Sequence, residues 1–364
     1  MVQLSVPLKS DPIQAVPWRR ADAPARLLVI RLQAFGDTVL TFPYVQALKR
    51  VWPGARVDLL TREEFVELPR ELALFDRVFG LGGGRDARLQ VGSGLALAPR
   101  LMMRRYQIVL DLQRNHTSRM IRRLLRPSAW TEFDRFSPQL AGERTRRTIE
   151  ALGIMLPAVY PDLRLRHDSA GVVALGRAGW DPQAELVVLN PAGAFPTRNW
   201  PLDNYVAFAE LWVPRRLRDT QFGVLGLSSL RPKVDYLRAR LGSRVLDLVG
   251  RTTTSEAFGI LRRATLLLSE DSGLMHLGWI AGAPTLALFG SSRHIWSAPH
   301  GSYSMCLHSG DLPCGACMDT VCRFGDVHCL TRQTPEVVAE AALALLLRAE
   351  TALKVIWQPP SPDG

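Results

Sequence analysis

The sequence contains no long run of apolar residues. No stretch of its 364 residues approaches the roughly 20 consecutive apolar residues that a helix needs to cross a bilayer. No apolar segment follows a basic one near the N-terminus, as it would in a secretory signal peptide. Since 47% of the residues are hydrophobic and 22% are charged, the composition is that of an ordinary globular protein, and we expect a cytoplasmic location.

The chain also lacks the fingerprints of two common binding classes. Gly36 is the only glycine in the first strand-to-helix turn, so the Gly-x-Gly-x-x-Gly pattern of a dinucleotide-binding dehydrogenase is missing. The aromatic, glycine-rich strands of common RNA-binding modules are missing too, and no nucleic acid is expected as a partner. A non-catalytic basic protein that binds nucleotides or nucleic acid is the alternative from another functional class.

Acidic residues are scarce in the first half only. Residues 1–165 hold 26 Lys and Arg against 16 Asp and Glu, whereas the rest of the chain holds 19 against 18. The net charge of +11 is therefore concentrated in the first half. This excess favours an anionic partner, which is a phosphorylated lipid, a membrane surface or nucleic acid. An Arg-rich surface that only promotes solubility is the plain alternative.

Short apolar strands alternate with amphipathic helices along most of the chain. This pattern predicts an α/β fold with parallel sheets covered on both faces. Because 364 residues are long for one core, we expect two doubly wound Rossmann-like domains that face each other across a cleft. The expected strands are 26–31, 55–60, 107–112, 186–190, 221–227, 266–268 and 285–289, and the expected helices include 38–51, 119–125 and 335–347.

Composition also predicts the domain boundaries. We expect a loose, proline-containing leader over 1–25, a first domain over 26–166 and a connector over 167–185. A second domain over 186–349 and a tail over 350–364 follow. In doubly wound sheets, ligands bind beyond the carboxyl ends of the strands, which is where the chemically interesting motifs of this chain lie.

The first motif is VIRLQAFGDTVLT, residues 29–41, in which a strand ends in a short loop and Gly36 and Asp37 open a helix. A carboxylate at a strand end can take a proton from an attacking hydroxyl, as a general base does. The alternative is that Asp37 only caps the helix that follows. The two roles are compatible.

The second motif is VLNPAGAFPTRNWP, residues 188–201. The Arg198 guanidinium can bind phosphate oxygens in a bidentate manner, and Thr197 adds a hydroxyl donor. A solvated loop arginine is the alternative for Arg198. For Trp200 we favour a role as a core anchor.

The third motif is SEDSGLMH, residues 269–276, followed by GAPTLALFG, residues 282–290. A strand runs into Asp271, Ser272 and Gly273, and the helix that begins there offers unpaired N–H groups to an anion. Gly273 allows a close approach of the backbone. We expect Asp271 to orient N–H groups or to contact a ribose. His276 can donate to a phosphate or be a buried core residue.

Two further clusters stand out, one of arginines and one of cysteines. Arg119, Arg122, Arg123 and Arg126 are spaced to share one helix face, and Arg114 precedes them. A solvated charged face is their alternative role. Four cysteines follow a compact spacing that favours tetrahedral Zn or Fe over disulfides, with reduced thiols as the alternative. They are Cys314, Cys317, Cys322 and Cys329.

The three motifs, in this order, resemble the signature segments of the glycosyltransferase family 9 heptosyltransferases, and the resemblance covers residues 26–347. It implies a GT-B fold and an inverting transfer of heptose from ADP-heptose to an anionic lipopolysaccharide-core acceptor. The same fold acting on a protein hydroxyl or another glycan is the alternative within this class.

The resemblance also implies roles for individual residues. In the family, the aspartate of the first motif is the general base, which here is Asp37. The basic residue of the second motif neutralises the donor diphosphate, a role implied for Arg198 with Thr197 beside it. The rest of the implied donor pocket consists of Asp271, Ser272, Gly273 and His276.

The acceptor, membrane and cofactor expectations follow from the same resemblance. The N-terminal domain of the family holds an anionic sugar-lipid, which implies acceptor binding by Arg114, Arg119 and Arg122 and peripheral contact with the cytoplasmic face of the inner membrane. No catalytic cofactor is implied. A structural Zn or Fe ion is implied, because protein-modifying heptosyltransferases carry an iron-binding finger of four cysteines, although with different spacing. The acidic residue that usually helps to hold the nucleoside is replaced by Ser228 and Ser229.

Overall fold

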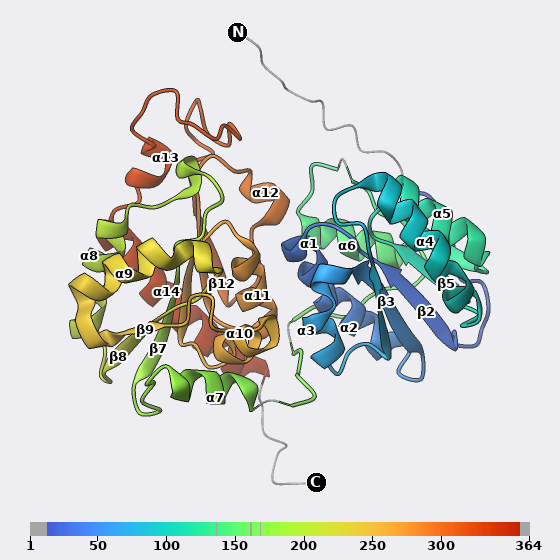
Figure 1. The fold of residues 1–364 in the computed structure, drawn as a ribbon, viewed down its shortest axis with the longest axis horizontal. Helices are drawn as coiled ribbons and strands as arrows, with labels where there is room; N and C mark the ends of the chain where they lie inside the picture. The colour runs from blue at the N-terminus through green and yellow to red at the C-terminus, as the bar shows by residue number, and fades with distance from the viewer. Residues whose placement is uncertain (1–12, 136, 161, 168, 357–364) are drawn as a thin grey trace. The chain divides into compact units, whose positions relative to one another are not determined.

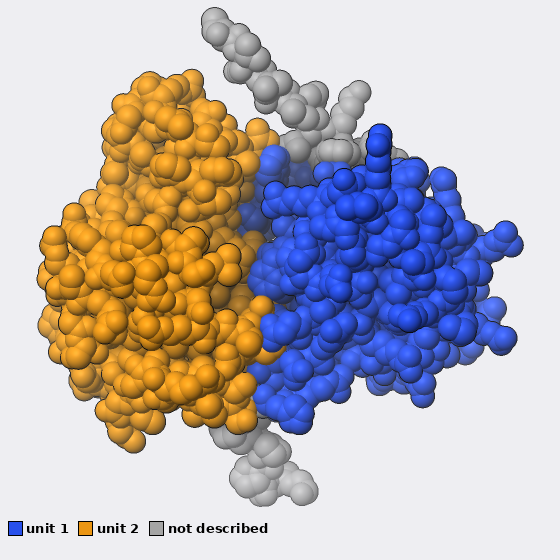
Figure 2. Space-filling view, in the orientation of Figure 1, with its two compact units in different colours: residues 1–167, 295–297 blue, residues 168–294, 298–364 orange. Residues whose placement is uncertain are grey.

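The structure, a computed structural model, describes residues 13–135, 137–160, 162–167 and 169–356. It divides into two compact units, shown in Figure 2. Unit 1 comprises residues 1–167 and 295–297, and unit 2 comprises residues 168–294 and 298–364. Each unit contains one six-stranded sheet (Figure 1). The expected leader and tail lie partly outside the described residues.

The sheet of unit 1 has the order β1-β6-β5-β2-β3-β4, and all of its neighbouring strands are parallel except β1 and β6. Helices α4 and α5 cover the face that carries Leu28 and Ile30. The strands are β1 Ala15–Val16, β2 Arg26–Ile30, β3 Arg56–Arg62, β4 Arg77–Leu81, β5 Ile108–Asp111 and β6 Ala129–Glu132. The helices are α1 Phe35–Leu40, α2 Phe42–Val51, α3 Glu67–Glu71, α4 Ala87–Met102, α5 His116–Leu125 and α6 Ala141–Glu150.

The central strand β2 shows why this sheet forms. Leu27, Leu28, Val29 and Ile30 are all fully buried, although their side chains alternate between the two faces. A strand of a parallel sheet is covered on both sides, so it needs a continuous apolar run and not an alternating one. The polar residues begin where the strand ends, and this is the edge of the sheet that carries Asp37.

Two features of unit 1 differ from the sequence predictions. The helix expected over 38–51 is two helices, α1 and α2, with Thr41 between them. Pro43 lies in the first turn of α2, where its missing N–H costs no hydrogen bond, so it favours a new helix start. Within the expected leader, Ala15–Val16 forms the edge strand β1, which pairs with Trp130 and Thr131.

The sheet of unit 2 has the order β12-β11-β10-β7-β8-β9 and is parallel throughout. Its strands are β7 Glu185–Asn190, β8 Thr220–Val224, β9 Val245–Asp247, β10 Leu266–Glu270, β11 Thr285–Phe289 and β12 Ser304–His308. Its helices are α7 Ala170–Arg177, α8 Leu202–Trp212, α9 Arg231–Leu241, α10 Thr254–Leu261, α11 Gly273–Ala281, α12 His294–Ser297, α13 His328–Thr331 and α14 Pro335–Ile356. Parallel sheets in both units confirm the predicted α/β class.

The core of unit 2 is rich in aromatic side chains. Trp200, Tyr205, Phe208, Trp212 and Phe222 are all buried in one cluster that helix α14 also covers. The Trp200 indole Nε1 donates to the carbonyl of Gln333 at 2.7 Å. Trp200 is therefore the core anchor that the sequence favoured. Among the residues described, no helix combines the length and the apolar character that a membrane span requires.

Candidate functional site

Asp37 lies in the first turn of α1, just beyond the carboxyl end of β2. Its Oδ2 accepts a hydrogen bond from the Ala34 backbone N–H at 3.1 Å and lies 3.4 Å from Nη2 of Arg31. The Asp37 side chain is 41% exposed, whereas that of Arg31 is 9% exposed. Asp37 thus stabilises the start of the helix while its carboxylate stays partly exposed.

The loop before Asp37 is fixed by the neighbouring strand. Gln113, which follows β5, accepts hydrogen bonds on its side-chain oxygen from the N–H groups of Leu32 and Gln33, each at 2.9 Å. The Arg31 guanidinium donates in turn to the carbonyl of Leu112. Three hydrogen bonds therefore tie the β2 and β5 loops together, so that the position of Asp37 depends on the β5 loop.

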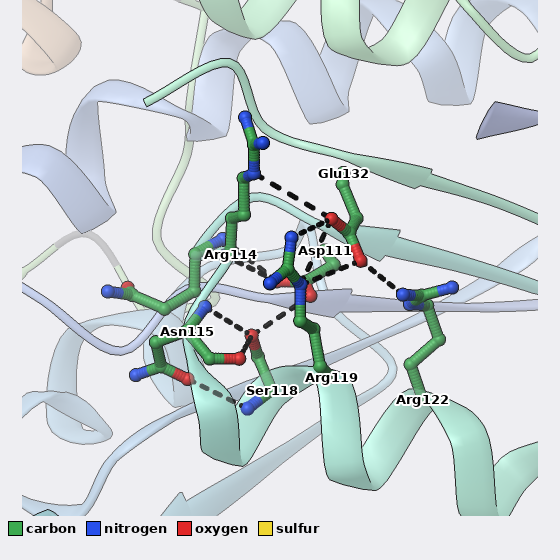
Figure 3. A network of polar contacts seen from close by, with 8 residues as sticks. Asp111, Arg114, Asn115, Ser118, Arg119, Arg122 and Glu132 are labelled. Atoms are coloured by element: carbon green, nitrogen blue, oxygen red, sulfur yellow. Dashed lines mark hydrogen bonds and ion pairs between the residues drawn. The ribbon is translucent and has the colours of Figure 1, made fainter. Parts of the chain in front are cut away.

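The three candidate acceptor-binding arginines converge on one buried carboxylate, Glu132 at the end of β6 (Figure 3). Arg119 donates from Nη2 to Oε2 at 2.7 Å and from Nε to both Glu132 oxygens at 3.1 Å. The Nε of Arg114 lies 3.7 Å away, and Arg122 donates to Oε1. Burial opposes ionisation, but the Arg119 hydrogen bond and the three positive charges lower the pKa of Glu132.

The predicted arginine face is therefore wrong in its geometry. Arg122 is only 7% exposed and its guanidinium lies 3.6 Å from the centre of the Trp130 ring, whereas Arg123 is exposed. Arg126 ends the helix in a left-handed conformation, with φ of 46°, so it leaves the helical face altogether. Of the three candidates, Arg119 has the most exposed side chain, at 37%.

Asp111, at the end of β5, organises the loop that carries Arg114. Its carboxylate accepts from the N–H groups of Gln113 at 3.1 Å and Arg114 at 2.8 Å, and from the Ser118 hydroxyl at 2.9 Å (Figure 3). Burial raises the pKa of Asp111 to about 6, against the lowering effect of these hydrogen bonds. The residue is a support for the loop and is itself inaccessible.

The donor-side candidates gather at the carboxyl ends of β7 and β10, which are neighbours in the sheet of unit 2. The register places Asn190, the last residue of β7, opposite Ser269. The Asn190 amide donates to Ser269 Oγ at 2.8 Å and to Ser272 Oγ at 2.6 Å. The buried Asn190 side chain thus fixes the point at which α11 begins.

The N-terminus of α11 is arranged to receive an anion. Ser272 is the N-cap, and its Oγ accepts from the Met275 N–H at 3.4 Å. The N–H groups of Gly273 and Leu274 have no intrahelical partner, and the helix start adds partial positive charge. His276, in the same turn, is only 5% exposed. A phosphate group fits this arrangement of donors.

Arg198 lies beside this helix start. Its Nη1 is 3.3 Å from Oδ2 of Asp271, and its guanidinium lies 5.1 Å from the centre of the Phe195 ring. The side chain is 16% exposed, so it is not a solvated loop arginine. Its Nε is buried and has no hydrogen-bond partner among the described residues.

Sequence reasoning missed Glu270, which holds the loop that carries Arg198. The buried Glu270 carboxylate accepts from the N–H groups of Gly193 and Trp200, each at 2.6 Å, and from the Tyr205 hydroxyl at 3.3 Å. Glu270 therefore holds both ends of the loop between Gly193 and Trp200. A Cβ at Gly193 would lie 2.3 Å from the Arg198 carbonyl oxygen, so only glycine allows this closure. Burial raises the pKa of Glu270 to about 7, although the Lys233 charge lowers it.

Lys233 on α9 is the second support of this loop that the sequence did not reveal. Its Nζ donates to the Pro191 carbonyl at 2.5 Å and to Oδ1 of Asn199. Burial lowers the pKa of Lys233. The sequence gives one local indication of the role of Glu270, which is that an acidic residue ends an apolar strand. It gives no such indication for Lys233.

Thr197 faces away from the proposed diphosphate contact. Its hydroxyl donates to the carbonyl of Asp319 at 2.6 Å and accepts from the Ser291 hydroxyl at 3.0 Å. Its single proton is therefore engaged with the loop between Cys317 and Cys322. This contact links the Arg198 loop to the cysteine-rich segment.

The four candidate metal ligands line one cavity of about 210 Å³ together with Asp319 and His328. They are free thiols, and the neighbouring thiols add to burial in raising the pKa of Cys329 to about 11. The described residues nevertheless contain no group of three or more Cys, His, Asp or Glu side chains placed to hold a metal ion. The type and number of ligands fit Zn or Fe, but their arrangement does not.

Comparison with known proteins agrees with these features. Residues 95–328 match the family described as Glycosyltransferase family 9 (heptosyltransferase). Lipopolysaccharide heptosyltransferase 1 of Pseudomonas aeruginosa is 25% identical, over 90% of this chain and 99% of the relative. Lipooligosaccharide heptosyltransferase 2 of Haemophilus ducreyi is 22% identical, over 75% of this chain and 86% of its own length.

Solved structures show the same fold at lower identity. A glycosyltransferase family 9 protein from Veillonella parvula superposes with a TM-score of 0.75 at 18% identity, over 89% of this chain and 97% of that one. Escherichia coli ADP-heptose lps heptosyltransferase II gives 0.67 at 18% identity, covering 89% and 99%. The E. coli heptosyltransferase WaaC with ADP-2-deoxy-2-fluoro heptose gives 0.61 at 19% identity, covering 87% and 98%. The predicted GT-B fold is confirmed.

Proposed function

This chain belongs to glycosyltransferase family 9 and is therefore a glycosyltransferase, and on that premise we propose that it moves a heptose from ADP-heptose to an anionic lipopolysaccharide-core acceptor. The observation that carries the proposal is the anion site of unit 2, in which Arg198 lies beside the open N-terminus of α11. A nucleoside diphosphate is the leaving group that such a site favours. The ligand of the E. coli WaaC structure, ADP-2-deoxy-2-fluoro heptose, supports the choice of donor.

The proposed reaction is a single displacement with inversion. The acceptor oxygen forms a bond to the anomeric carbon while the bond from that carbon to the diphosphate oxygen breaks. Asp37 takes the proton from the acceptor hydroxyl, and its exposed carboxylate suits that role. Arg198 and the N–H groups of Gly273 and Leu274 receive the negative charge of the departing diphosphate.

On the acceptor side, we assign the anionic groups of the saccharide to Arg114 and Arg119. Three guanidinium groups face the carboxylate of Glu132 and the nearby charge of Asp111, so a net positive charge is left at the end of β6. Arg122 is buried behind them and keeps the cluster in place. Carboxylates and phosphates of a lipopolysaccharide core are the matching ligands.

The donor assignment is tested by calorimetry of the whole protein against ADP, UDP and GDP, followed by a turnover assay with ADP-heptose. We expect ADP to bind most tightly and heptose to be transferred to a lipid-A-linked core acceptor. Tighter binding of UDP, with no consumption of ADP-heptose, would show that the proposed donor is wrong.

Replacing Arg198 by Ala should weaken ADP binding by roughly 1.5 to 3 kcal/mol, because a charge-assisted contact to the diphosphate is lost. Adenosine lacks the diphosphate, so its affinity should change much less. Arg218→Ala is the matched control, since Arg218 is an exposed arginine of the same unit. Equal losses for ADP and adenosine would instead indicate that the loop from 191 to 199 has collapsed.

The structural metal stays a prediction from the cysteine spacing. If the four thiols bind Zn or Fe, elemental analysis of protein purified without chelator should find near one metal ion per chain, since structural sites bind tightly once folded. Cys317→Ser should then lower the melting temperature sharply, with Cys306→Ser as the control outside the cavity lining. Metal-free protein with four titratable thiols and an unchanged melting temperature for Cys317→Ser would contradict the prediction.

A further inference from the structure

Helix α4 of unit 1 exposes large apolar side chains along its outer face. Its inner face packs on α5 (Figure 1), so closely that a Cβ at Gly94 would meet the side chains of Met120 and Ile121 at 3.2 and 3.3 Å. The outer face carries what we call the α4 stripe: Leu89, Leu95, Met102 and Met103, which are 62%, 52%, 53% and 75% exposed. A soluble monomer rarely leaves so many large apolar side chains on one helix face without a partner for them.

The charges within and after helix α4 are all positive, and Asp86, the N-cap, is the acidic residue at its start. From Ala87 to Arg105 the chain contains four arginines and no acidic residue. Arg104 pairs with the buried Asp58, but Arg88, Arg100 and Arg105 are exposed and make no ion pair with any residue that the structure describes. On the neighbouring helix, Arg123 and Arg126 are also exposed.

We propose that the α4 stripe is the surface by which this protein docks onto a bilayer that contains anionic lipids. A helix whose exposed face combines Leu and Met with arginine flanks inserts its apolar side chains at the level of the headgroups, while the guanidinium groups bind lipid phosphates. The excess of arginines over the single acidic N-cap, Asp86, selects an anionic surface over a neutral one. The inference rests on the proposed function and deepens it, because it names the surface on which a lipid-borne acceptor is met.

The test is co-sedimentation of the full chain with vesicles at constant salt. One set of vesicles contains phosphatidylethanolamine, phosphatidylglycerol and cardiolipin, and the other contains phosphatidylcholine alone. The apolar variant Leu95→Asp/Met103→Asp and the charge variant Arg88→Glu/Arg100→Glu change exposed positions, so both should fold. The matched control is Leu217→Asp/Arg218→Glu, which makes the same kinds of change at fully exposed positions of unit 2.

We expect the parent and the control to bind the anionic vesicles and not the phosphatidylcholine vesicles. The charge variant should lose at least about tenfold in binding, since each arginine near an anionic surface contributes about 1 kcal/mol and 1.4 kcal/mol is a tenfold change. The apolar variant should also lose at least about tenfold, because it places carboxylates where apolar side chains would insert. No binding by the parent, equal binding to both vesicle types, or full binding by the stripe variants would overturn the proposal. So would a concentration-dependent dimer that the stripe variants abolish, because the stripe would then be covered by a second copy.

A second measurement separates this proposal from the proposed function. With a water-soluble acceptor from which the acyl chains have been removed, the stripe variants should turn over ADP-heptose at the parental rate. If vesicle binding is lost while that rate is kept, both proposals are supported. If the parent binds vesicles but transfers no heptose to any acceptor, the docking surface is supported and the proposed function fails.

Discussion

Asp37→Asn should lower the rate of heptose transfer by roughly two to four orders of magnitude, the usual contribution of a general base. The amide keeps the shape of the side chain but cannot take the proton from the acceptor hydroxyl. Binding of ADP should be unchanged, because the anion site lies entirely on residues of unit 2. Turnover measured under saturating donor and acceptor, with ADP affinity measured separately, checks both parts.

Asp86→Asn is the matched control for this experiment. Asp86 is the N-cap of α4, and its carboxylate accepts from the N–H groups of Arg88 and Leu89. Like Asp37, it stabilises a helix start with its carboxylate, although as the N-cap and not as the third helical residue, and it follows the edge strand β4 and not the central strand β2. Asparagine caps helices about as well as aspartate, so this variant should retain its activity. If Asp37→Asn keeps more than about half of the parental rate, Asp37 is only a helix cap and the base is another group.

Loss of the Arg31 contact must be separated from loss of the base. The Asp37 side chain is 41% exposed, so its ion pair with Arg31 is partly screened by water. We expect the substitution to cost at most about 1 kcal/mol of unfolding free energy. A thermal melt within a few degrees of the parent, together with a rate loss of at least about a hundredfold, would assign the effect to chemistry and not to stability.

The strands were the most predictable part of this protein. Parallel strands covered on both faces must be continuously apolar, and such runs stand out in a sequence without any tertiary information. The strand over 285–289 has the predicted bounds, and the strands at 26–30 and 185–190 differ from prediction by one residue. The helix expected over 38–51 was wrong because one proline in its first half starts a second helix.

The contacts between side chains were much less predictable. The spacing of Arg119 and Arg122 indicated a charged surface, but it could not reveal Glu132, because that residue reaches them only through the pairing of β5 with β6. Glu270 is adjacent in sequence to a predicted site residue, yet its partners lie 70 and 77 residues away. Local patterns therefore predicted the candidate loops, and the sheet register determined which buried charges support them.

Glu132→Gln should lower the free energy of unfolding at neutral pH by about 3 to 5 kcal/mol, because it removes a carboxylate that pairs with three arginines and leaves buried positive charge that Asp111 compensates only in part. The largest part of this loss should come from Arg122, whose side chain is 8% exposed. Arg119 should contribute less, because its side chain is 37% exposed and water screens its charge. Urea unfolding of the parent and the variant measures the difference.

The dependence of this difference on pH gives a sharper test. The arginines lower the pKa of Glu132 in the folded state. The stability that Glu132 contributes is therefore fully present above its pKa in the unfolded chain, about 4.3, and is lost as the pH falls through its pKa in the folded protein. The parent and the variant should therefore differ by a constant amount near neutral pH and converge in acid. Glu185→Gln, which removes a carboxylate paired with Arg216 alone, is the control and should cost less. A loss for Glu132→Gln no larger than that of the control would mean that the three arginines find other partners, and that Glu132 does not hold the cluster together.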